Sequence, residues 1–134
     1  MRVLFDTNVI LDVVLERVPF YHSSALALSR ASSPRLQGFV SAHAIPTIAY
    51  IVGKTKAAKD VRRVLESLLS GLSVAAVTEA GIRRALISPL TDFEDAVTLA
   101  AAEECQANYI VTRNTRDFAR SSVRAILPEI FLET

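Results

Sequence analysis

Residues 3–15 have the sequence VLFDTNVILDVVL, and this stretch decides the fold. Its first three residues form an apolar run that is too short for a helix and is typical of a buried strand in a parallel sheet. The polar residues 6–8 then offer side chains that cap helices, and the segment from Val9 to Leu15 is apolar apart from Asp12. A strand that passes at once into a buried helix is the beginning of a βαβ unit.

The rest of the chain alternates between the same two kinds of element. Helical spacing and stop signals predict helices over residues 21–31, 42–53, 56–69, 79–86 and 93–105. Short apolar runs predict strands over residues 38–41, 72–76, 109–111 and, at an edge and ended by Pro128, 123–127. Because strands separated by helices form right-handed βαβ units, we predict an α/β fold of three layers, α/β/α, around a central, mostly parallel sheet of four or five strands.

Composition limits the kind of protein this is. The 134 residues fit one domain over 1–134, and 51% apolar with 22% charged residues suit a chain that folds alone. The single Cys105 has no cysteine or histidine partner at metal-site spacing, which argues against structural zinc and favours a reducing compartment. No stretch of about 18 apolar residues is present, so we expect a cytoplasmic protein that does not contact a membrane. A net charge of +1 neither favours nor excludes nucleic acid.

Polar residues gather where a parallel sheet binds its ligands, beyond the carboxyl ends of the strands. Those that follow predicted strands are Asp6, Ser41, Asn114 and Asp117. Asp92 and Asp95 open a predicted helix three residues apart and therefore project from one face of it. These carboxylates are candidates for binding a hard cation, which prefers oxygen ligands from several parts of a chain.

Each of these groups also has a structural explanation. Thr91 with Glu94 matches a capping box, and Asp6 suits a strand-to-helix turn in which it caps the helix. Asp117 could cap the turn around Phe118 or form a surface ion pair. Independent caps need not converge on one place, however, whereas a cation site requires it. The combined pattern is therefore more specific than any one motif.

Three segments together resemble the successive signatures of PIN domains: LFDTN at 4–8, DFEDA at 92–96 and VTRNTRDF at 111–118. Their order and positions are similar to that family from about residue 2 to residue 132. The resemblance implies the PIN fold and a ribonuclease that depends on Mg²⁺ or Mn²⁺. It also implies that the chain could be a VapC-type toxin, which a small antitoxin protein encoded beside it holds inactive.

Carried over residue by residue, the resemblance makes Asp6 and Asp95 the metal ligands. The family's acid after the 109–111 strand falls on Asn114, and Asp117 lies one short turn further. The glutamate expected on the helix after Ser41 is replaced by Thr47. Asp92 or Glu94 could compensate, although Glu94 is expected to point about 100° away from Asp95 on the helix and to be the poorer ligand.

The predicted function is hydrolysis of RNA phosphodiesters by a metal-dependent endoribonuclease. Asp6 and Asp95 would hold the main ion, while Asp117, with Asn114 or Asp92, would orient waters or help a second ion to bind. The residues expected to support the site or bind substrate are Asn8, Thr112, Arg113 and Arg116. Arg120 is expected to contact phosphates together with Arg113 and Arg116. A basic run of Lys54, Lys56, Lys59, Arg62 and Arg63 could contact RNA or form a solvated helix face. Apolar helices near Val9–Leu15 and 44–52 could form a homodimer or partner surface, or pack only in the core.

Two other functions compete with this prediction. Without acids at Thr47 and Asn114, the domain could have lost efficient catalysis and act by binding RNA or a partner protein. A receiver-like domain with Asp6 as phosphate acceptor would need an acidic neighbour and a late lysine, which the sequence lacks. Nucleophilic catalysis has no support, and both His22 and His43 are expected to be structural.

Overall fold

Five short strands form one parallel sheet in the computed structural model, which describes residues 1–134. The strand order is β3-β2-β1-β4-β5, so the first strand lies at the centre. The strands are β1 (Arg2–Phe5), β2 (Gln37–Ser41), β3 (Ser73–Ala75), β4 (Tyr109–Val111) and β5 (Arg124–Ile126). All four pairings are parallel, which confirms the predicted α/β class and its sheet.

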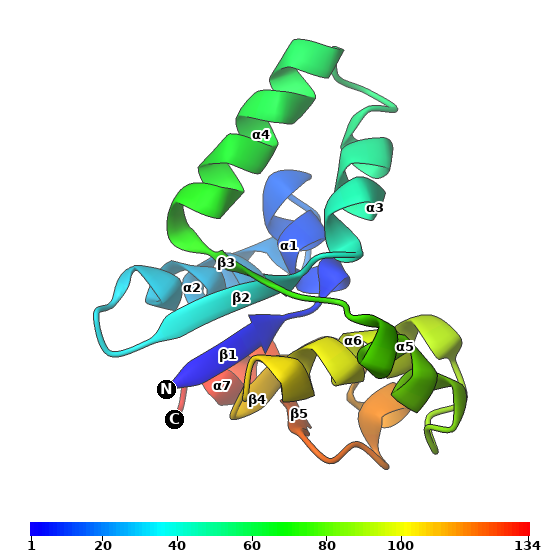
Figure 1. Ribbon diagram of the computed structural model, residues 1–134. Helices are drawn as coiled ribbons and strands as arrows, with labels where there is room; N and C mark the ends of the chain where they lie inside the picture. Colours follow the sequence, from blue (N-terminus) through cyan, green and yellow to red (C-terminus); the bar gives the residue numbers. More distant parts are fainter.

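Helices cover both faces of this sheet (Figure 1). One face carries α1 (Thr7–Val14), α2 (Tyr21–Ser29), α3 (Ala44–Val52), α4 (Ala58–Gly71) and α7 (Pro128–Phe131). The other face carries α5 (Glu79–Leu86) and α6 (Phe93–Glu104). Two short 3₁₀ turns, η1 (Arg30–Ser32) and η2 (Thr115–Phe118), follow α2 and β4. No helix is long and apolar enough to span a bilayer.

The predicted elements are found with small changes at their ends, and one element was missed. Residues after Pro128 form the short helix α7, whereas the sequence had suggested only that this proline ends the last strand. Proline suits the first position of a helix, where its missing N–H would have no intrahelical partner. The ring of Phe131 on α7 then packs edge-on against Phe5, with 6.3 Å between ring centroids.

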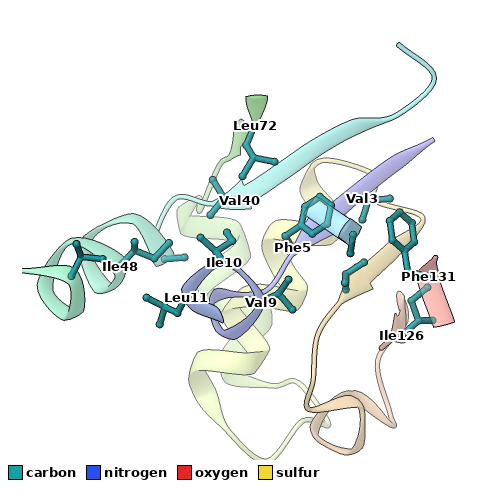
Figure 2. Close-up of a cluster of buried hydrophobic side chains, with 14 of the residues drawn as sticks. Val3, Phe5, Val9, Ile10, Leu11, Val40, Ile48, Leu72, Ile126 and Phe131 are labelled. Atoms are coloured by element: carbon teal, nitrogen blue, oxygen red, sulfur yellow. The ribbon is translucent and has the colours of Figure 1, made fainter. Parts of the chain in front are cut away.

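Side chains alternate in direction along β1, so this strand contributes to two separate hydrophobic clusters. Val3 and Phe5 point towards α1, α2 and α7, while Leu4 points towards α5 and α6. Figure 2 shows the first cluster, in which Val9 and Ile10 of α1 pack beside Phe5. Since α1 and the buried face of α3 contribute to this core, their apolar character is explained by core packing. Tyr50 of α3, which is 71% exposed, is an exception.

Gly38 of β2 lies where no side chain fits, which yields a test of the packing. A Cβ at this position would lie 2.8 Å from both Ala31 Cβ and Leu72 Cδ2, and 3.1 Å from the ring of Phe5. We expect Gly38→Ala to lower the free energy of unfolding by about 1–3 kcal/mol through overpacking, measured by urea denaturation. Gly71→Ala is the control, because its Cβ would meet nothing within 4 Å. It should be neutral or stabilising, and equal losses in both variants would contradict this explanation.

Candidate active site

Three polar residues lie in one row where the central strands end. Leu4 pairs with Phe39 of β2 and with Ile110 of β4, so the residues two positions later, Asp6, Ser41 and Thr112, occupy the next matching positions. Side chains alternate along strands, which directs all three to the face that carries α6. Each of the three is buried. The parallel register therefore brings together residues from three distant parts of the chain.

Asp6 is held by hydrogen bonds on both carboxylate oxygens. Its Oδ1 accepts from the Thr7 N–H at 2.8 Å, and its Oδ2 accepts from Thr112 Oγ1 at 2.8 Å and from Asn8 Nδ2 at 3.4 Å. Burial raises the pKa of Asp6, and the Thr112 hydrogen bond only partly opposes this. Asp6 is thus both the N-cap of α1 and the buried carboxylate at the centre of the edge, so capping does not exclude a functional role.

Two further acids begin α6. Asp92 is the N-cap, and its Oδ2 accepts from the Asp95 N–H at 3.1 Å, so the expected capping box between Thr91 and Glu94 does not form. The pKa of Asp95 is raised to about 7, first by partial burial and then by the negative charges of Glu94, Asp92, Asp6 and Asp117. The negative charges that act on Asp95 therefore come from the end of β1, the start of α6 and η2.

A polar cleft of about 570 Å³ opens between the start of α6 and the loop after β4. Its polar lining consists of Thr91, Asp92, Asp95, Asn114, Arg116, Asp117 and Arg120. Neither arginine in this lining forms a salt bridge. The cleft thus combines carboxylates with arginines that remain available for another anion. The basic side chains from Lys56 to Arg63 are exposed on and before α4.

Glu94 and His43 also belong to this edge. From the sequence, Glu94 was only an alternative to Asp92, and His43 was expected to be structural. After burial, the charge of Glu94 is the first of those that raise the pKa of Asp95, and the expectation that Glu94 is the poorer ligand stays a prediction. Its Oε2 lies 3.3 Å from His43 Nε2, and His43 Nδ1 lies 2.5 Å from Ser41 Oγ. The sequence signal for His43 was its place two residues after Ser41, the last residue of β2.

Arg113, a predicted substrate ligand, is engaged elsewhere. Its Nε and Nη2 donate to the two oxygens of the fully buried Asp12 at 2.7 and 3.1 Å. Its guanidinium carbon lies 3.9 Å above the Phe20 ring, and its backbone N–H donates to Asn8 Oδ1 at 3.3 Å. Arg113 therefore ties the loop after β4 to α1, and Arg116 and Arg120 are the arginines that line the cleft.

The donor set suits a hard cation in its chemistry. No group of three or more acidic, histidine or cysteine side chains is close enough to form a ready-made metal cage. The carboxylates that raise the pKa of Asp95 nevertheless face one another without an arginine or lysine bound to Asp6, Asp92, Asp95 or Asp117. Oxygen donors of one charge that repel one another are what Mg²⁺ or Mn²⁺ would bind after small side-chain adjustments.

A parallel sheet with acids at its carboxyl edge defines a class of α/β domains whose ligands bind beyond the strand ends. Among known families, the PIN domain matches residues 2–116, and the chain belongs to this family. This confirms the family resemblance that the sequence motifs indicated. The replacement of a family acid by Thr47 stays a prediction. No curated protein matches the chain significantly.

Several solved structures are similar in fold. A toxin–antitoxin complex from Klebsiella pneumoniae has 24% identity and a TM-score of 0.74, over 94% of this chain and 97% of that chain. VapBC-1 from nontypeable Haemophilus influenzae has 16% identity and a TM-score of 0.72, over 96% and 99%. FitAcB from Neisseria gonorrhoeae has 19% identity and a TM-score of 0.72, over 95% and 98%. At these identities the likeness shows the fold.

The raised pKa of Asp95 predicts how stability depends on pH in the metal-free protein. The pKa of Asp95 is 3.8 in the unfolded chain and about 7 in the folded chain. Between these two pH values the folded state therefore binds more protons than the unfolded state. Its contribution to the free energy of unfolding is therefore present at low pH and is lost as pH rises through about 7. Asp95→Asn should stabilise the chain more at about pH 8 than at about pH 4, in urea denaturation with a chelator. Asp60→Asn on α4 is the control, and an equal difference at both pH values would contradict the prediction.

The Asp12–Arg113 pair predicts a large loss of stability when it is broken. Arg113→Met leaves Asp12 buried beside only the weaker contacts of Ser24 and Arg17. We expect the free energy of unfolding to fall by about 3–5 kcal/mol, because an uncompensated charge remains inside the protein. Arg63→Met, which breaks an exposed pair with Asp60, should cost less than about 1 kcal/mol. Similar losses of unfolding free energy from both substitutions, measured by urea denaturation, would show that the buried pair stabilises the protein no more than the exposed pair does.

Proposed function

We propose that this PIN domain is a metal-dependent endoribonuclease whose active site is the carboxylate edge around Asp6 and Asp95. The observation that carries the proposal is the partly buried Asp95 beside acids from separate elements: burial first, and then their negative charges, raise its pKa to about 7. A strongly perturbed carboxyl in a polar cleft is typical of functional sites, since folding alone gains nothing from repulsion between like charges.

Asp6 and Asp95 would hold the ion. When bound, Mg²⁺ or Mn²⁺ supplies charge neutralisation at the scissile phosphate and an activated water. Thr112 and Asn8 keep the Asp6 carboxylate in one orientation through their hydrogen bonds to Oδ2. Asn114 and Asp117, on the far side of the cleft from α6, would orient water with Asp92.

Two arginines give the cleft the fixed positive charge that an RNA backbone would need. Arg116 and Arg120 line the same hollow as Asp92 and Asp95 and hold fixed positive charge beside the acids. Backbone phosphates need such charge, and contacts of this kind position a strand without selecting its sequence. Arg113 would act indirectly, because its bonds to Asp12 and Asn8 hold the loop that carries Asn114.

A toxin held by a small antitoxin is the proposed biological setting, in the cytoplasm. The similar structure from Klebsiella pneumoniae is a toxin–antitoxin complex, which supports a protein partner for this chain. An apolar hollow of about 520 Å³ between α1, α2 and α4, lined by Val13, Leu28 and Val64 among others, offers a surface for it. We also propose that the chain forms a homodimer and that residues 1–134 fold as one domain.

A binding module is the second candidate. It is favoured by the absence of a ready-made group of three metal-binding side chains and by neutral Thr47 and Asn114 at positions expected to be acidic. Such a protein would bind RNA through Arg116 and Arg120 without cutting it. The two candidates therefore differ in cleavage and not in RNA affinity.

Cleavage of a panel of structured RNAs by the purified chain, with Mg²⁺, Mn²⁺ or chelator, tests the function. We expect metal-dependent cutting that falls to the chelator level in Asp6→Asn and in Asp95→Asn, because each removes a charged ligand. Asp60→Asn on α4 should cut as the unchanged protein does. RNA binding without any cleavage in either metal would instead favour the binding module.

A further inference from the structure

We propose that Glu94, held by His43 and Thr98, supplies the third metal-binding carboxylate of this site in place of the acid that PIN domains would carry at Thr47. The inference rests on the proposed function and adds a residue to it. It concerns a side chain that helical geometry alone would direct away from Asp95.

The first support is the way Glu94 is anchored. Its Oε2 accepts from Thr98 Oγ1 at 3.1 Å and lies 3.3 Å from His43 Nε2. Its other oxygen, Oε1, has no hydrogen-bond partner, and the side chain is 51% exposed. One oxygen thus fixes the direction of the carboxylate while the second remains available to a ligand. A surface glutamate in an isolated ion pair does not have one oxygen fixed by two partners and the other left available.

The second support is the chain of contacts behind His43. With Nε2–H donated to Glu94, Nδ1 accepts from Ser41 Oγ at 2.5 Å, and this assignment satisfies both ring nitrogens. Ser41 occupies the position on β2 that matches Asp6 on β1. His43 therefore connects Glu94 to the end of β2 through one hydrogen bond on each ring nitrogen. Histidine and hydroxyl groups that orient a ligand carboxylate in this way are typical of metal sites.

The third support is the location of Thr47. Thr47 lies one turn after His43, and its hydroxyl donates to the His43 carbonyl at 3.5 Å. Residues four apart project from the same side of a helix, so an acid at position 47 and the imidazole of His43 would approach the same part of the edge. In this chain the carboxylate that contacts His43 comes from α6, at Glu94, instead of from α3.

Binding of Mn²⁺ alone to the full chain, measured by calorimetry, tests the inference without relying on RNA cleavage. Glu94→Gln should weaken Mn²⁺ binding by about tenfold or more, as loss of a charged ligand would. Adding Thr47→Glu to Glu94→Gln should restore most of the affinity, because the acid returns from the other helix. Glu66→Gln, an exposed change on α4 that alters net charge equally, should bind as the unchanged protein does.

His43 is a positioning residue in this scheme, and a double-mutant cycle separates that role from a merely structural one. His43→Phe should weaken Mn²⁺ binding when Glu94 is present and have no further effect in Glu94→Gln. A structural histidine would cost the same in both backgrounds. Urea denaturation of each variant shows whether it is folded under the conditions of the titration.

The outcomes separate this inference from the proposed function. If Glu94→Gln binds Mn²⁺ as Glu66→Gln does, while Asp6→Asn loses binding, the role of Glu94 is overturned and the metal site at Asp6 stands. If the unchanged chain binds no Mn²⁺, both are overturned. Loss in Glu94→Gln with recovery on adding Thr47→Glu supports the substitution of one helix for the other.

Discussion

The hydrogen bond from Thr112 to Asp6, 2.8 Å long, is the contact on which the functional edge depends. It joins the ends of the two strands at the centre of the sheet, and it lies where both side chains are buried. A buried carboxylate is costly unless it is hydrogen-bonded, so Asp6 is tolerated there because Thr112 and the first N–H of α1 both donate to it. Asn114 N–H also donates to Thr112 Oγ1 at 3.0 Å, which fixes the loop that lines the cleft. One hydroxyl thereby positions a candidate ligand and the opposite wall of its site.

Acidic residues occur in two different environments in this fold, one in which a cation compensates the charge and one in which none does. Asp12, on the face of α1, is fully buried and bound by Arg113 at both oxygens, so its charge is compensated inside the protein. Asp95, on the other face, has no cation bound to it and is repelled by four other carboxylates. The first arrangement stabilises the native state as long as both partners are present. The second arrangement destabilises it at neutral pH, a cost that makes sense if a cation binds there.

Much of the fold could be predicted because it depends on local patterns. Short apolar runs between helical segments indicated the parallel sheet, and polar residues at strand ends indicated Asp6 and the loop after β4. The short helix α7 was missed because four residues contain too little periodicity to detect, and only its packing against Phe5 explains it. The role of Arg113 could not be predicted either, since its partner Asp12 lies 101 positions away in sequence. Contacts of that kind depend on the strand order, which no local pattern contains.

The case of Glu94 shows what ideal helical geometry leaves open. Two residues adjacent in a helix differ by about 100° in direction, and this angle had separated Glu94 from Asp95. A glutamate side chain is long enough for a partner outside the helix to decide where its carboxylate lies, and here His43 and Thr98 do so. Asp95 is shorter, so its carboxylate stays close to the start of the helix, beside the cap formed by Asp92. The carboxylates of these adjacent acids are therefore positioned in two different ways, the shorter one by its own helix and the longer one by the neighbouring strand end.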